Sequence, residues 1–162
     1  MNILLDTCSF LWLVKRSEAL SVNAVDALVE PEDEVYLSAV SAWEISVKYR
    51  FGKLPLPILP GQFVPKERAR HLIAPLDLSE RDTLHLHKLP SPHKDPFDRM
   101  LVCQDIEHSM TLLTPDPLIM QYPIRCLWRR VTRVSHRPSR VRGSHIARLM
   151  QDVCFARASR PG

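Results

Sequence analysis

The chain begins with a short, mostly apolar run, NILLD at residues 2–6, that closes on an aspartate. A short run of apolar residues is typical of a strand buried on both faces, as in a parallel sheet. A carboxylate at the end of such a strand is costly unless it is paired, hydrogen-bonded or bound to metal. The run therefore predicts a buried strand and, at Asp6, a polar site at its end.

Strand and helix signals alternate along the next hundred or so residues. Apolar runs predict strands over 2–6, 34–38, 111–114 and 124–128. Helical spacing predicts helices that include 10–14, 20–30, 41–49, 61–71, 78–89 and 95–110. Strands separated by helices form parallel sheets with helices on both faces, so an α/β fold is expected.

Three of these helices carry a local start signal. Ser41, with Glu44 three residues later, matches a capping box. Ser79 is placed to cap the helix that follows it. Asp95 is followed by Pro96, which suits an N-cap and the first helical position.

The net charge of +4 hides an asymmetry along the chain. Residues 1–128 hold 13 basic and 17 acidic residues, whereas residues 129–162 hold nine arginines and a single acid, Asp152. An acidic domain binds nucleic acid poorly, because phosphate contacts need lysine and arginine. Contact between residues 1–128 and a polyanion would therefore require a cation that neutralises the acids.

Four acids from distant parts of the sequence are expected at one edge of the sheet: Asp6, Glu44, Asp98 and Asp116. Each lies close behind a predicted strand or in the first turn of a predicted helix, and ligands of open α/β sheets bind beyond the carboxyl ends of the strands. Clustered carboxylates repel one another unless a hard cation such as Mg²⁺ or Mn²⁺ binds them. Individually, Glu44 could complete a capping box, Asp98 could complement the helix dipole and Asp116 could be a turn residue.

The strings NILLDT, LSAVSAWEISVKYRFGKL, HKDPFDRMLVCQ and LLTPD, with a closing IRCLW, resemble the PIN domain. The similarity is greatest to the VapC-type toxin ribonucleases of bacterial type II toxin–antitoxin pairs, and it covers residues 1–128. It implies a PIN-like three-layer α/β/α sandwich around a mostly parallel sheet of four to five strands. Residues 129–162 would then be a basic C-terminal extension.

The resemblance also implies an activity, the hydrolysis of RNA phosphodiesters with Mg²⁺ or Mn²⁺ as cofactor. Asp6, Asp98 and Asp116 match metal ligands of the family, and Glu44 matches its remaining catalytic acid. Hydroxide generated at such a site would leave a 5′-phosphate and a 3′-hydroxyl. A cognate antitoxin protein is the expected partner, and a homodimer is the expected assembly.

Residues around the acids are candidates for supporting roles. Lys48, Arg50 and Arg99 could contact the RNA backbone, or they could be solvated helix residues. Thr7 and Thr114 could donate hydrogen bonds that hold the acids. His93 could meet phosphate, although an ordinary loop histidine is the simpler interpretation. An exposed tryptophan could stack on RNA bases, although core or interface roles are commoner.

Other classes of function are compatible with part of this pattern. A non-catalytic RNA- or protein-binding PIN module would keep the fold, and a DNA-cleaving relative would keep the acids as well. A haloacid-dehalogenase-like phosphatase also begins with a strand ending in aspartate, but it needs D-x-D and Cys8 stands in the second position. The scattered cysteines and the absence of a signal-like or membrane-spanning run predict a cytoplasmic protein.

The C-terminal extension divides into two parts. Residues 129–142 are rich in arginine and lack acids, which favours a flexible linker. Apolar residues from Ile146 to Cys154 then recur at helical spacing, which predicts a short helix over about 145–156 with Ser144 as N-cap. This segment could attract RNA without sequence preference, or it could have no role.

Overall fold

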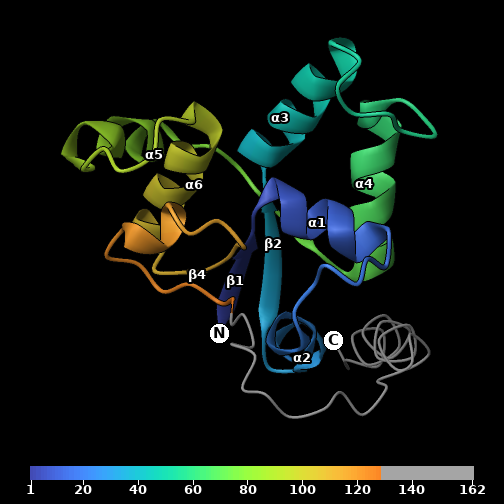
Figure 1. Cartoon of the computed structure of the whole chain (residues 1–162), viewed down its shortest axis with the longest axis horizontal. Coiled ribbons are helices and arrows are strands. Elements are labelled where there is room, and N and C mark those ends of the chain that lie inside the picture. Colours follow the sequence, from blue (N-terminus) through green and yellow to red (C-terminus); the bar gives the residue numbers. More distant parts are fainter. Residues whose placement is uncertain (129–162) are drawn as a thin grey trace, which may run out of the picture.

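A computed structural model describes residues 1–128 of the chain. The linker expected at 129–142 and the helix expected at 145–156 lie outside the described residues. Figure 1 shows the arrangement of the described part.

The described residues contain one sheet of four strands. They are β1 (Asn2–Leu5), β2 (Glu34–Ser38), β3 (Ala74–Leu76) and β4 (Thr111–Leu113), in the order β3-β2-β1-β4. Every pairing is parallel, with Ile3 of β1 opposite Val35 of β2 and Thr111 of β4. The helices are α1 (Thr7–Val14), α2 (Val22–Val29), α3 (Ala39–Arg50), α4 (Pro60–His71), α5 (Glu80–His85) and α6 (Pro96–Glu107), with short 3₁₀ turns η1 (Leu86–Lys88) and η2 (Ile119–Gln121).

Side chains of the central strand β1 alternate between two apolar cores. Ile3 and Leu5 pack in the core that includes residues of α1, α2 and α4, and Leu4 packs in the core that includes residues of α6. Figure 1 shows α5 and α6 on one side of the sheet and α1 and α4 on the other. Because both faces are covered, the expected three-layer α/β/α architecture with a parallel sheet is confirmed.

The strand order places a topological switch point between β1 and β4. From β1 the chain moves outward through β2 to β3, and it then returns to the opposite side of β1. The helix α1, which follows β1, and the helix α6, which precedes β4, lie on opposite sides of the sheet (Figure 1), and a crevice opens at the carboxyl ends of these two strands. Asp6 directly follows β1 and Asp116 follows β4, so both acids lie at this crevice.

Helix starts were predicted with mixed success. Ser79 caps α5 in a full capping box with Asp82, and Asp95 caps α6 with Pro96 as the first helical residue. The capping box predicted at Ser41 is wrong, because α3 begins earlier and Ser38 is its N-cap. Ser38 is the last residue of β2, and its hydroxyl accepts from the Val40 N–H at the start of α3. The strand therefore passes directly into the helix.

Two strand predictions also need correction. The three-residue strand β3 was not predicted, because it is short and contains Pro75 at the edge of the sheet. The strand predicted over 124–128 reduces to a single parallel bridge between Cys126 and Leu112. Within residues 1–128, no helix is both long enough and apolar enough to cross a membrane.

One buried acid of α6 lies outside the crevice and affects stability. Asp105 is only 3% exposed, and its Oδ1 has no hydrogen-bond partner among the described residues. Burial raises the pKa of this carboxyl to about 7, and the charge of Arg125 only partly opposes the rise. The folded state therefore holds the proton more tightly than the unfolded chain does, and stability should fall as pH rises from the ordinary carboxyl range through 7.

We expect Asp105→Asn to stabilise the protein at pH 8 and to have little effect at pH 4. The raised pKa sets an upper limit of roughly 4 kcal/mol, and relaxation around the charge reduces it, so about 2 kcal/mol is expected at pH 8. Chemical denaturation of the variant and the wild type at both pH values measures the difference. Asp26→Asn, the same change at an exposed position of α2, is the control. An equal pH dependence in wild type and Asp105→Asn would contradict the prediction.

Candidate active site

The crevice between β1 and β4 forms a cavity of about 280 Å³ that the four predicted acids line together. Asp6 comes from the end of β1, Glu44 from α3, Asp98 from α6 and Asp116 from the loop after β4. The complete lining is Asp6, Thr7, Cys8, Glu44, Lys48, Asp95, Asp98, Pro115, Asp116 and Pro117. The expected convergence of the four acids is therefore present. Glu44, however, was predicted in the first turn of its helix and lies in the second turn, because α3 begins at Ala39.

Asp6 is both the end of the strand and the N-cap of α1. Its Oδ1 accepts from the Ser9 N–H at 2.6 Å, and the residue is only 4% exposed. Burial raises the pKa of this carboxyl, hydrogen bonds from Ser9 and Thr114 oppose the rise, and the charge of Glu44 adds to it. Asp6 is thus held rigidly in a place where its negative charge is unfavourable.

Glu44 is buried on α3 and is held by two side chains. The Thr7 hydroxyl donates to Oε2, and the Lys48 ammonium, one helical turn along α3, pairs with Oε1. Glu44 makes no capping box, since α3 begins at Ala39. These two partners orient the Glu44 carboxylate. Thr7, which was expected to hold one of the acids, therefore holds Glu44.

Asp98 lies in the first turn of α6, behind the N-cap Asp95. The Asp95 carboxylate accepts from the N–H groups of Phe97 and Asp98, which explains why the motif needs two aspartates three residues apart. The first aspartate starts the helix, and the second is free to face the cavity. Burial and the charges of Asp95, Glu44 and Asp6 raise the pKa of Asp98 to about 7, and His93 opposes this rise.

Asp116 is positioned by its own turn. Its N–H donates to the Thr114 hydroxyl at 3.2 Å, and its Oδ1 accepts from the Leu118 N–H at 2.7 Å. Its Oδ2 is left facing the cavity, 3.2 Å from Nε2 of His93. Asp116 is therefore a turn residue, as one interpretation of the sequence had it, and the turn leaves one of its carboxylate oxygens available for the site.

His93, for which an ordinary loop histidine was the simpler interpretation, lies beside two of the acids. It is 8% exposed, and its Nε2 lies within 3.3 Å of Asp98 and 3.2 Å of Asp116. Within residues 1–128, His93, Asp98 and Asp116 form the one group of three residues whose ligand-type atoms all lie within 4.8 Å of one another. Its place just ahead of the Asp95–Asp98 motif was the only signal for this role in the sequence.

The residues present fit a divalent cation. Burial and neighbouring acids raise the pKa of Asp6 and Asp98 and also raise that of the Cys8 thiol to about 11, so the cavity disfavours added negative charge. Lys48 is the lysine among the lining residues, and it is engaged by Glu44. A cation bound by the carboxylate oxygens would offset this excess, and Mg²⁺ and Mn²⁺ prefer such hard ligands.

The basic candidates do not all reach the cavity. Lys48 lines it, whereas Arg50 is exposed at the last turn of α3 and Arg99 of α6 donates to the Ser91 hydroxyl at 3.1 Å. Trp43, next to Glu44 in sequence, is 58% exposed, and its ring contacts Phe97, next to Asp98, at a centroid distance of 4.8 Å. Trp12 and Trp128 instead stack on each other against the core.

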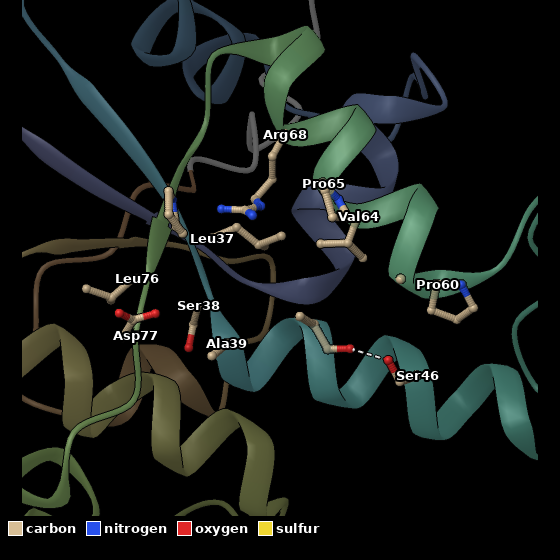
Figure 2. A pocket seen from close by; sticks show the side chains of 13 residues that line it. Leu37, Ser38, Ala39, Ser46, Pro60, Val64, Pro65, Arg68, Leu76 and Asp77 are labelled. Carbon is tan, nitrogen blue, oxygen red and sulfur yellow. Dashed lines mark hydrogen bonds between the residues drawn. The ribbon is translucent and has the colours of Figure 1, made fainter.

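A second cavity, of about 270 Å³, lies between α3 and α4 at the carboxyl ends of β2 and β3. Figure 2 shows the Arg68 side chain extending from α4 into this cavity, and Ser46 of α3 hydrogen-bonded to its own helix at Ala42. None of the four predicted acids lines it. Its lining is mainly aliphatic, with Asp77 as its acid, so the cation-binding chemistry belongs to the cavity between β1 and β4.

Comparison with known proteins identifies the fold. The sequence profile of the PIN domain family matches residues 3–122. The chain belongs to the PIN domain family. The resemblance of the sequence motifs to the PIN domain is thereby confirmed. In this PIN domain the sheet is parallel and the acids lie at its switch point.

Among characterised relatives, ribonuclease VapC16 of Mycobacterium tuberculosis is 38% identical over 78 residues. That match covers 48% of this chain and 55% of the relative, so the aligned part spans about half the length of the relative.

Among solved structures, the VapBC2 complex of Rickettsia felis, bound to a DNA fragment from its promoter, matches with a TM-score of 0.61 and 15% identity, covering 80% of this chain and 100% of the matched chain. VapBC-1 of nontypeable Haemophilus influenzae matches with a TM-score of 0.54 and 18% identity. This match covers 78% of this chain and 97% of the matched chain. At these identities the likeness establishes the PIN fold.

Proposed function

We propose that this PIN domain protein is a divalent-metal-dependent endoribonuclease and the toxin of a VapBC-type toxin–antitoxin pair. The proposal is supported by its membership of the PIN family and by its similarity to a relative named as a VapC ribonuclease. The observation that carries it is the convergence of Asp6, Glu44, Asp98 and Asp116 in one cavity that disfavours negative charge.

The carboxylates would share the work as follows. Asp6, Asp98 and Asp116 would hold Mg²⁺ or Mn²⁺, which when bound lowers the pKa of water and offsets charge on the phosphoryl oxygens. Glu44, fixed by Thr7 and Lys48, would accept a proton from the attacking water and keep it in line with the scissile bond.

Substrate contacts would come from the rim of the cavity. Lys48 lines the cavity beside Glu44, and its ammonium could contact a phosphate there. Trp43 and Phe97 contact each other and precede Glu44 and Asp98 in the sequence, and the exposed ring of Trp43 could bind an unpaired base by stacking. Arg50 and Arg99 lie farther out and would act through long-range attraction.

The direct test is incubation of the purified full-length protein with matched RNA and DNA, each with Mg²⁺, Mn²⁺ or EDTA. The proposal expects RNA cleavage with either metal, 5′-phosphate products, and loss of cleavage in EDTA. Cleavage of DNA alone would assign a DNA-cleaving relative. Binding of RNA without cleavage under every condition would assign the non-catalytic PIN module.

Expression of the protein alone is expected to arrest bacterial growth, and the product of a neighbouring gene is expected to relieve the arrest. The solved structural relatives are VapBC complexes, which supports a protein partner of this kind. A basic side chain of that partner placed against the acids would compete with the metal. Colony counts after induction, with Asp98→Asn as the inactive control, measure the effect. Equal arrest by wild type and Asp98→Asn would contradict it.

We further propose that residues 1–128 form the nuclease and that residues 129–162 form a separate basic extension. The PIN family match ends at residue 122. Trp128, at the end of the described residues, still packs on Trp12 and on the core, which supports a boundary after it. A homodimer and a cytoplasmic location complete the proposal.

A further inference from the structure

His93 makes hydrogen bonds through both of its ring nitrogens, and the direction of one of them is fixed. The Asp95 N–H donates to Nδ1 at a nitrogen–nitrogen distance of 2.9 Å. A backbone N–H can only donate, so Nδ1 must be the acceptor. In a neutral imidazole whose Nδ1 accepts, the proton resides on Nε2.

The protonated Nε2 faces two carboxylates from different elements. Oδ2 of Asp116 lies 3.2 Å away, and Oδ2 of Asp98 lies 3.3 Å away. The hydrogen bond of Nε2 is to Asp116, and Oδ2 of Asp98 lies within ion-pair distance of the same nitrogen. His93 therefore lies between the loop after β4 and the start of α6. The electron pair that would bind a metal is absent from this nitrogen, although its position beside two acids is that of a ligand.

The same histidine also fixes the backbone of Asp98. The Asp95 N–H is held by Nδ1, and the Asp95 carboxylate accepts from the Asp98 N–H at 3.4 Å. Oδ2 of the Asp98 side chain in turn lies 3.3 Å from Nε2 of His93. His93, Asp95 and Asp98 therefore form a closed ring of contacts in which His93 is buried and the two aspartates are half-buried.

We propose that His93 is a positioning residue that donates Nε2–H to the carboxylates of Asp98 and Asp116, and that it is not a ligand of the metal. The proposal deepens the proposed function, because it concerns the metal site of that reaction. It assigns the cation to carboxylate oxygens alone and gives the histidine the task of holding two of them at a fixed separation. Partners of this kind commonly change metal affinity by 10- to 100-fold.

The first measurement is the tautomer of His93 in the metal-free, full-length protein, from long-range proton–nitrogen NMR correlations. The chain has seven histidines, so the His93 signals are assigned by their loss in His93→Gln and their retention in His87→Gln, an exposed control. The proposal expects an unprotonated Nδ1 and a proton on Nε2. A proton on Nδ1 would overturn it.

The second measurement uses Mn²⁺ alone as the probe, with pulsed electron paramagnetic resonance of the bound ion. The proposal expects no strong coupling from a directly coordinated nitrogen in the wild type. It also expects Mn²⁺ affinity to fall about tenfold in His93→Ala and to recover partly in His93→Gln, whose amide can donate to the same carboxylates. A coordinated nitrogen that disappears in His93→Gln would overturn the proposal, as would unchanged affinity in His93→Ala.

These outcomes separate this inference from the proposed function. If the expected tautomer and Mn²⁺ spectrum are found but RNA is not cleaved, the inference stands and the ribonuclease assignment fails. If Mn²⁺ does not bind, the assignment of metal ligands and the proposed donor role toward them both fail, whichever tautomer is found. If RNA is cleaved with a nitrogen-coordinated Mn²⁺, only the role of His93 is overturned.

Discussion

Asp98→Asn is expected to lose at least about a hundredfold of metal-dependent RNA cleavage while the protein remains folded. The change removes a charged metal ligand with almost no change in shape. A weakly bound metal would no longer offset the charge that develops on the phosphoryl oxygens in the transition state. Asp6→Asn should behave alike, because the amide oxygen can still accept from the Ser9 N–H that caps α1. Single-turnover cleavage of a defined RNA measures the loss. Retention of most activity in either variant, with normal Mn²⁺ affinity, would contradict these assignments.

The same Asp98→Asn variant should be more stable than the wild type when both are free of metal at pH 8. The pKa of Asp98 is raised to about 7, so its ionisation opposes folding as pH rises through that value, and asparagine removes the charge. Stabilisation by added Mn²⁺ should disappear at the same time. Thermal unfolding with and without Mn²⁺ measures both effects, with Asp26→Asn as the matched control. Lower metal-free stability would indicate a structural role for this acid.

Glu44→Gln is expected to reduce cleavage by about 10- to 1,000-fold and to change stability little. Glutamine keeps an oxygen that can accept from Thr7, but it cannot take a proton from water. Its loss of charge also releases Lys48 from the ion pair of α3. Turnover at saturating RNA, with folding checked by chemical denaturation, measures the two effects separately.

Ser41→Ala provides the matched control for Glu44→Gln. The two residues were predicted to form one capping box, but Ser38 caps α3, and the buried hydroxyl of Ser41 has no hydrogen-bond partner among the described residues. Ser41→Ala should therefore cleave RNA like the wild type. Unchanged turnover in Glu44→Gln would remove Glu44 from the catalytic set.

Much of this fold is determined by signals that are local in the sequence. The apolar run before Asp6 predicts a buried strand because only the interior of a parallel sheet suits it, and β1 is that central strand. The pair Asp95 and Pro96 predicts a helix start because the cap and the fixed proline backbone act within a few residues. Such signals also placed Asp6 and Asp116 behind strands and Asp98 in the first turn of α6, whereas Glu44 lies in the second turn of α3.

The remaining errors arise where local signals compete or vanish. Ser38 and Ser41 are both reasonable caps in isolation, and Ser38 prevails because β2 ends there and its hydroxyl also donates to Gln104 of α6. The strand β3 exists because β2 offers it an open edge, since its own sequence contains a proline. Residues 124–128 are apolar apart from Arg125, yet only Cys126 has a bridge partner.

The sequence by itself determined which ionisable residues are available, where β1, β2 and β4 lie, and where α5 and α6 begin. The tertiary structure decided which of these residues meet. Asp116 and Asp98 face the same histidine only because β4 pairs with β1 and not with β3, and no local pattern specifies that order. Contacts across a sheet depend on strand pairing over the whole chain. For that reason His93, ordinary within its own loop, belongs to the site only in the folded protein.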